Sequence, residues 1–140
     1  MYEYRCKILR VVDGDTVDVD IDLGFGIWMH RERIRVMGID TPESRTRDLT
    51  EKAFGLAAKE FVKSLMPIGS TQIIKTQKDK TGKFGRVLGD FIIEDKLLTE
   101  YMIENYHAVP YHGESKETTQ EGHMINRTKL IELGLIKIED

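Results

Sequence analysis

Acidic side chains crowd residues 11–22, where five aspartates fall within ten consecutive positions. They are Asp13, Asp15, Asp18, Asp20 and Asp22. Carboxylate oxygens at such short spacing are the ligands that hard cations such as calcium prefer. An EF-hand loop beginning at Asp18 is excluded, because it needs glycine at its sixth position and glutamate at its twelfth. Leu23 and Met29 occupy those two positions.

The five aspartates belong to two different settings. Asp18, Asp20 and Asp22 alternate with Val17, Val19 and Ile21. This pattern predicts a strand that turns its acidic side toward water. Asp13 and Asp15 instead flank Gly14, and an Asp-Gly pair is typical of a turn between strands. Turn formation accounts well for Asp13, and the motif alone is too short to assign a function to Asp15.

A second group of polar residues follows the apolar and basic run that contains Arg35. Asp40, Thr41, Pro42 and Glu43 stand in succession directly after it. Two carboxylates from separate segments and a backbone carbonyl from Thr41 would make half of a coordination shell for a hard cation. The same four residues also fit the approach to a helix, with Asp or Thr as its cap. The spacing supports both interpretations equally.

A basic segment, DKTGKFGR, places Lys83, Phe84 and Arg86 just before an apolar run. A solvated turn explains it as ordinary surface. Arg35 and Arg86 are of more interest as a pair, because guanidinium groups match phosphate oxygens in a bidentate manner.

Several other chemistries are excluded by the motifs that the chain lacks. The four histidines have no zinc-ligand spacing, and there is no P-loop and no G-x-S-x-G sequence. Cys6 is the only cysteine, so it forms no internal disulfide. No apolar run reaches membrane-spanning length. The first residues lack a signal peptide's apolar region, so we expect a cytoplasmic rather than a secreted protein.

Charge is unevenly distributed along the chain. The net charge is −3, which argues against a protein that coats nucleic acid indiscriminately. Residues 30–90, however, carry 13 Lys and Arg against 8 Asp and Glu. A local basic face is therefore compatible with the composition.

These side chains must be positioned by strands followed by helices. Period-two apolar patterns predict strands within residues 6–12, 16–21, 31–39, 71–76 and 85–93. From Thr50 the apolar period changes to that of a helix, which ends before Pro67 and Gly69. A short helix near residues 98–105 and a third helix from about Lys116 to Leu133 follow. We expect one domain over residues 1–140, of α+β class: a five-stranded OB-fold-type β-barrel with three α-helices.

Together the three segments resemble the thermonuclease, or staphylococcal-nuclease-like, family. The residues that carry the resemblance are D-G-D-T at 13–16, R-x-x-x-x-D-T-P-E at 35–43, K-F-G-R at 83–86 and the helix pattern at 51–62. The likeness covers nearly the whole chain. It implies an OB-type barrel with three helices, in agreement with the predicted elements.

The resemblance also implies roles for individual residues. Asp15, Asp40 and the Thr41 carbonyl would bind calcium, although oxygen ligands admit magnesium and manganese as well. Glu43 would act as general base or orient the attacking water, and Arg35 and Arg86 would hold the phosphate and stabilise the transition state. The reaction implied is hydrolysis of phosphodiester bonds in DNA and RNA, which leaves 3′-phosphate and 5′-hydroxyl ends. Single strands are the expected preferred substrate, and the protein is expected to be a monomer that does not bind membranes.

The chain departs from the family pattern at its substrate-binding positions. Phe84 stands where the better-known member has a tyrosine, so a hydroxyl contact to the terminal phosphate is lost, while Lys83 is present and Tyr111 is a candidate nucleotide contact. The segment between Asp15 and Arg35 is longer than in that member, and we expect its Phe25 and Trp28 to cover the barrel rather than stack on bases. The alternative function is a noncatalytic OB-fold nucleic-acid-binding module, which would have no need for all five catalytic and metal-binding side chains.

Overall fold

The structure, a computed structural model, describes residues 2–81 and 87–138, with the strand assignment alone for residues 78–81. Its strands are β1 (Tyr2–Asp13), β2 (Thr16–Gly24), β3 (Ile27–Val36), β4 (Ile39–Asp40), β5 (Thr71–Thr81), β6 (Val87–Ile93), β7 (Lys96–Leu97) and β8 (Val109–Pro110). Its helices are α1 (Leu49–Leu65), α2 (Leu98–Glu104) and α3 (Lys116–Glu132).

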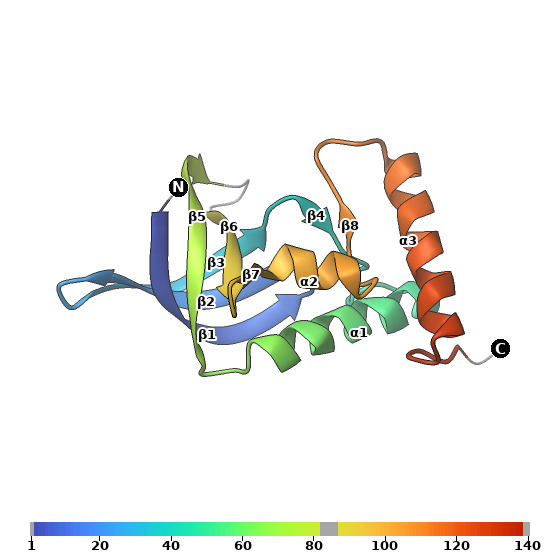
Figure 1. Ribbon diagram of the computed structural model, residues 1–140, viewed down its shortest axis with the longest axis horizontal. Coiled ribbons are helices and arrows are strands. Elements are labelled where there is room, and N and C mark those ends of the chain that lie inside the picture. Colours follow the sequence, from blue (N-terminus) through green and yellow to red (C-terminus); the bar gives the residue numbers. More distant parts are fainter. Residues whose placement is uncertain (1, 82–86, 139–140) are drawn as a thin grey trace.

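The five long strands close into a ring. They lie in the order β3-β2-β1-β5-β6, and β6 also pairs with β3 in parallel, with Ile34 opposite Val87 and Arg35 opposite Leu88. Figure 1 shows this curved sheet with α1 beneath it and α3 standing at the far end. The predicted α+β, OB-type arrangement of five strands and three helices is confirmed. Three two-residue strands, β4, β7 and β8, were not predicted.

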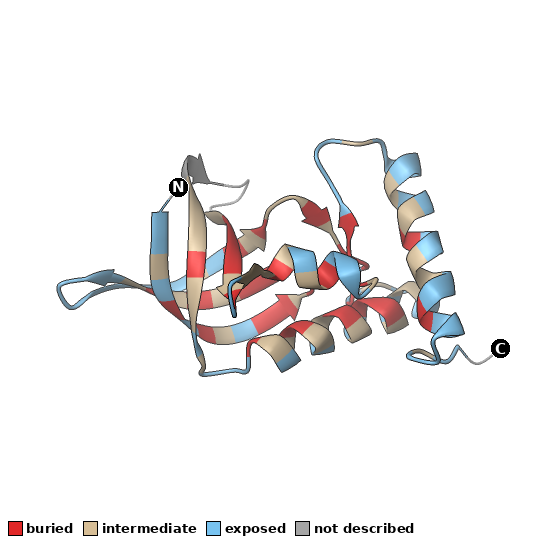
Figure 2. Cartoon of the chain, in the orientation of Figure 1, coloured by how far each residue is buried: buried red, intermediate tan, exposed pale blue. Residues whose placement is uncertain are grey.

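The interior of the ring is filled by the apolar side of each strand. Val17, Val19 and Ile21 of β2 are buried, whereas the aspartates between them are half-buried and face outward. This confirms the predicted water-facing side of the strand. Figure 2 shows that the buried residues lie along the strands of the ring and along α1, whereas the projecting hairpin is exposed. Alternation of apolar residues therefore sets the strand register, because a shift by one would bury the aspartates.

Helix α1 begins where a capping residue satisfies its first amides. The Asp48 side chain accepts hydrogen bonds from the backbone N–H groups of Thr50 and Glu51, at 3.0 and 3.1 Å. Since Asp48 is the cap, Asp40 and Thr41 are not, and the interpretation of those two residues as a helix cap is wrong. Phe54, Ala58 and Val62 are buried on the face toward the sheet.

The β2–β3 hairpin projects from the ring, at the left of Figure 1. Phe25 at its tip is fully exposed, and Trp28 is 43% exposed. The prediction that these aromatic residues cover the barrel is therefore wrong. The hairpin is long enough to carry its tip, with Phe25, past the edge of the ring. Within the described ranges, no helix is both long and apolar enough to cross a membrane.

Candidate active site

The site lies where the β1–β2 turn meets the end of β3. Asp15 follows β1, and the register of β2 with β3 places Thr16 opposite Arg35. The backbone N–H of Val36 donates to the carbonyl of Asp15 at 2.8 Å, which fixes the turn against β3. Gly14 makes the approach possible, because a Cβ there would lie only 3.0 Å from the Ala58 Cβ on α1. Strand pairing thus brings two predicted site residues together.

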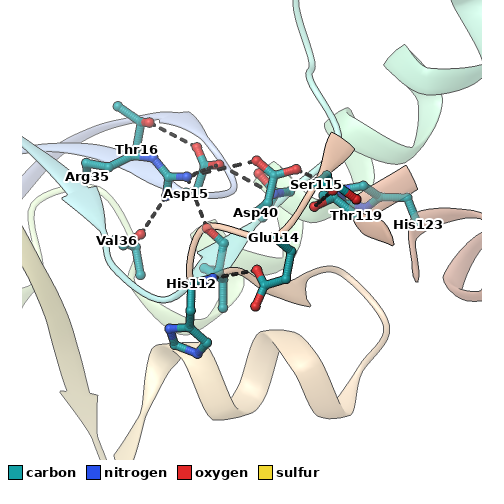
Figure 3. A network of polar contacts seen from close by, with 12 residues as sticks. Asp15, Thr16, Arg35, Val36, Asp40, His112, Glu114, Ser115, Thr119 and His123 are labelled. Atoms are coloured by element: carbon teal, nitrogen blue, oxygen red, sulfur yellow. Dashed lines mark hydrogen bonds and ion pairs between the residues drawn. The ribbon is translucent and has the colours of Figure 1, made fainter. Parts of the chain in front are cut away.

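Arg35 lies between two carboxylates. Its Nη2 atom is 3.5 Å from Asp15 Oδ2 and 3.9 Å from Asp40 Oδ1. The guanidinium also donates to the backbone carbonyls of Val36, at 2.5 Å, and Ile39, at 3.0 Å. Figure 3 shows the guanidinium pointing toward both aspartates. These bonds hold the group rigidly and leave N–H donors over for a further anion.

Asp15 is the more deeply buried of the two carboxylates. Burial raises the pKa of the Asp15 carboxyl, and the charge of Asp40 adds to that rise, whereas Arg35 and the Thr16 hydroxyl, 3.0 Å away, oppose it. A carboxylate taken out of water beside a second carboxylate gains from a cation that replaces the lost solvation.

The donor set fits a hard divalent cation. Asp15 and Asp40 lie at one guanidinium nitrogen, and the backbone N–H of Thr41 is 3.4 Å from Asp15 Oδ2. The Thr41 hydroxyl is buried and has no hydrogen-bond partner among the described residues. Oxygen donors of this kind suit calcium or magnesium. In the described part of the chain no three His, Cys, Asp or Glu side chains form a metal-binding group, so a cation here depends on two carboxylates and backbone or solvent oxygen.

Sequence reasoning missed His123. Its Nε2 atom lies 2.8 Å from Asp40 Oδ2, and its side chain is only 8% exposed. An ionised carboxylate only accepts hydrogen bonds, so the imidazole N–H is the donor. No sequence signal could have found this contact, because the two residues are 83 positions apart and belong to no shared motif.

Glu43 and Tyr111 border one open cavity of about 420 Å³, which Asp40, Thr41 and His123 also line. The Glu43 side chain is exposed, and Tyr111 is 41% exposed. Tyr111 reaches this place because β8 pairs with β4 and its own N–H donates to the Gly38 carbonyl at 2.9 Å. The cavity therefore places the Glu43 carboxylate and the Tyr111 ring on one accessible surface with Asp40, the carboxylate next to Arg35.

Three of the predicted site residues, Lys83, Phe84 and Arg86, lie outside the described residues. Within the described chain, Asp15, Arg35 and Asp40 form one cluster, and Thr41, Glu43 and Tyr111 lie beside it. Cys6 has no part in the site, because it is buried and burial raises the pKa of its thiol to about 12.

Comparison with known proteins identifies a family whose sequence pattern this chain matches. A sequence profile described as "Staphylococcal nuclease homologue" matches residues 33–130. The chain is 30% identical over 105 residues to a thermonuclease of Staphylococcus hyicus, covering 70% of this chain and 57% of that protein. It is 32% identical over 100 residues to a thermonuclease of Staphylococcus intermedius, covering 66% and 54%.

A third relative is much larger. The chain is 28% identical over 115 residues to endonuclease YhcR of Bacillus subtilis, covering 78% of this chain and 9% of that protein. The chain spans about half the length of both thermonucleases. The profile match includes Arg35, Asp40, Thr41 and Glu43, and it begins after Asp15.

Proposed function

The chain belongs to the staphylococcal nuclease homologue family, and on this premise we propose that it is a metal-dependent nuclease. Its reaction is hydrolysis of phosphodiester bonds in DNA and RNA, with calcium as the cation, leaving 3′-phosphate and 5′-hydroxyl ends. One observation carries the proposal: Arg35 is held between Asp15 and Asp40, and Asp40 lines the same open cavity as Glu43.

Arg35 binds the scissile phosphate in this scheme. Its backbone hydrogen bonds and the Asp15 ion pair fix the direction of the guanidinium before substrate arrives. Preorganised positive charge gives the strongest stabilisation to a transition state that gathers negative charge on phosphoryl oxygens. Arg86 supplies the second guanidinium by the family resemblance.

Glu43 receives or orients the proton of the attacking water. Its carboxylate is exposed at the cavity, so solvent reaches it directly. Asp15, Asp40 and the Thr41 carbonyl would hold the cation. When bound, a divalent cation polarises the phosphoryl oxygen and makes water more acidic.

Substrate specificity follows from the rim of the cavity. Tyr111 exposes an aromatic ring beside Glu43, and unpaired bases stack on such rings without regard to sequence. We therefore propose single-stranded nucleic acid as the preferred substrate. By the family resemblance we propose a monomer as the active form.

The test is cleavage of single-stranded DNA with calcium, followed by end-group determination. We expect 3′-phosphates, loss of activity in excess chelator, and a rate at least about 100-fold lower for Glu43→Ala, as for loss of one transition-state stabiliser. Glu60→Gln, an exposed carboxylate on α1, is the matched control and should retain full activity. Binding of DNA without cleavage by the unmodified protein would instead identify a noncatalytic binding module.

A further inference from the structure

The backbone at Glu43 and Ser44 passes unusually close to helix α1. Gly55 is buried on that helix, and a Cβ at this position would overlap the carbonyl group of Glu43 and lie 2.6 Å from the Ser44 nitrogen. The atoms in the way are backbone, so no change of rotamer relieves the contact. Glycine is among the least favourable residues within a helix, and this close approach gives a physical reason for it here.

The same peptide is also held by Asp13, the last residue of β1. The Ser44 hydroxyl donates to Asp13 Oδ1, and the Ser44 backbone N–H donates to the same atom at 3.3 Å. Ser44 is only 2% exposed. The Glu43–Ser44 peptide is therefore in close contact with Gly55 on α1 and is hydrogen-bonded to Asp13 at the β1–β2 turn.

The Glu43 carboxylate has no such restraint of its own. Among the described residues no hydrogen bond or ion pair reaches it, and its side chain is exposed. Where this carboxylate lies relative to Arg35 and Asp40 depends on the backbone that carries it. A misplacement of about 1 Å at a reacting group can cost about 100-fold in rate.

We propose that Gly55 and the Asp13–Ser44 pair are positioning residues for Glu43. Gly55 lets α1 approach the peptide, and Asp13 holds Ser44 by its two hydrogen bonds. The proposal rests on the proposed nuclease function and assigns to Asp13 a role that turn formation does not include.

A double-mutant comparison tests the proposal by steady-state cleavage of single-stranded DNA. Gly55→Ala should lower kcat about 100-fold and leave KM within a few-fold, because Arg35 and Tyr111 keep their places. In a Glu43→Ala protein, the same Gly55→Ala change should alter kcat less than about 2-fold, since the group it displaces is absent.

Two further variants cover the case in which Gly55→Ala does not fold. Ser44→Ala removes the hydroxyl donor and should lower kcat at least about 10-fold, again only when Glu43 is present. Asp13→Asn is the conservative variant: it keeps an oxygen acceptor for Ser44, so its kcat should remain close to that of the unmodified protein. Val62→Ala is the control: it lies on the same helix, is fully buried, and should lower stability without lowering kcat.

The outcomes separate the inference from the function on which it rests. Equal losses of kcat with and without Glu43, or unchanged kcat in both Gly55→Ala and Ser44→Ala, would overturn the positioning role while the nuclease function stands. An unmodified protein that cleaves nothing would overturn both.

Discussion

The hydrogen bond between His123 and Asp40 ties the last helix to the predicted cation site. Asp40 accepts from His123 at one carboxylate oxygen, and its other oxygen is 3.9 Å from Arg35. Both oxygens are thus directed by neighbours, which fixes the plane of the carboxylate. His123 is the only one of these residues that comes from the C-terminal part of the chain. Hydrogen-bond partners that orient metal ligands contribute to metal affinity without touching the metal.

Replacing His123 should therefore weaken cation binding. We expect His123→Ala to lower calcium affinity about 10- to 100-fold, as measured by titration calorimetry on the full chain without substrate. His30→Ala is the matched control, because His30 also contacts an aspartate, Asp20 at 3.3 Å, but is exposed on β3. Equal affinities for all three proteins, with unchanged melting temperature, would show that His123 does not orient Asp40.

At the scale of elements, α2 depends on a residue from a strand. Its N-cap residue, Leu97, makes no side-chain cap. Asp90 on β6 takes that part: its carboxylate accepts from the backbone N–H of Thr99 at 3.4 Å and from the Thr99 hydroxyl at 2.7 Å. Burial raises the pKa of the Asp90 carboxyl, although these hydrogen bonds oppose the rise.

This burial predicts a definite pH dependence for the Asp90→Asn variant. A raised pKa means that the folded state binds the proton more tightly than the unfolded chain does, so Asp90 lowers stability as pH rises from 3.8 through its folded value. Asparagine carries no charge, and its Oδ1 can still accept from the backbone N–H groups of Phe91 and Thr99 while its Nδ2 donates to the Thr99 hydroxyl. Urea unfolding at pH 4 and pH 7 should therefore show Asp90→Asn gaining stability relative to the unmodified protein at the higher pH. A gain at the lower pH would contradict the assigned cause.

Much of the fold could be predicted because it follows from local periodicity. The alternation of Val17, Val19 and Ile21 sets a strand side, and the helical period after Thr50 sets α1. Arg35 and Asp40 were predictable as neighbours because only a few residues separate them, at the end of β3 and in the short strand β4 that follows it. Contacts that join distant segments left no such signal: His123 with Asp40, and Asp13 with Ser44, are formed only when α3 and the β1–β2 turn reach their places.

At the scale of the whole molecule, the position of the β2–β3 hairpin was predicted wrongly. Phe25 and Trp28 were expected to cover the barrel because large aromatic residues usually pack against a core. The tip instead projects beyond the ring (Figure 1), and its turn carries Phe25 at φ 56, a conformation that L residues other than Asn and Asp seldom adopt. A rule about average burial cannot foresee how far a hairpin extends.

The acidic side of β2 places negative charge between this tip and the proposed cation site. Asp18 pairs with Arg33 at 2.9 Å, Asp20 accepts from the Arg31 backbone N–H at 2.9 Å, and Asp22 accepts from Gly24 at 2.8 Å. Each is therefore engaged along the hairpin rather than at the site. Counting along the strand from Asp15, they begin about 10 Å and end about 23 Å away. Their charges therefore act on the site only as a long-range field through the solvent, which salt screens.

Distance and screening together predict how the triple variant Asp18→Asn, Asp20→Asn, Asp22→Asn behaves. It removes three negative charges from a chain of net charge −3, so an approaching polyanion meets less repulsion. The screening length is about 30 Å at 0.01 M salt and about 8 Å at 0.15 M. We therefore expect a lower KM for single-stranded DNA at 0.01 M salt, no difference at 0.15 M, and calcium affinity within a few-fold at both. A large loss of calcium affinity would place one of these carboxylates at the cation, and a KM effect that persists at the higher salt would require a direct contact between β2 and the nucleic acid.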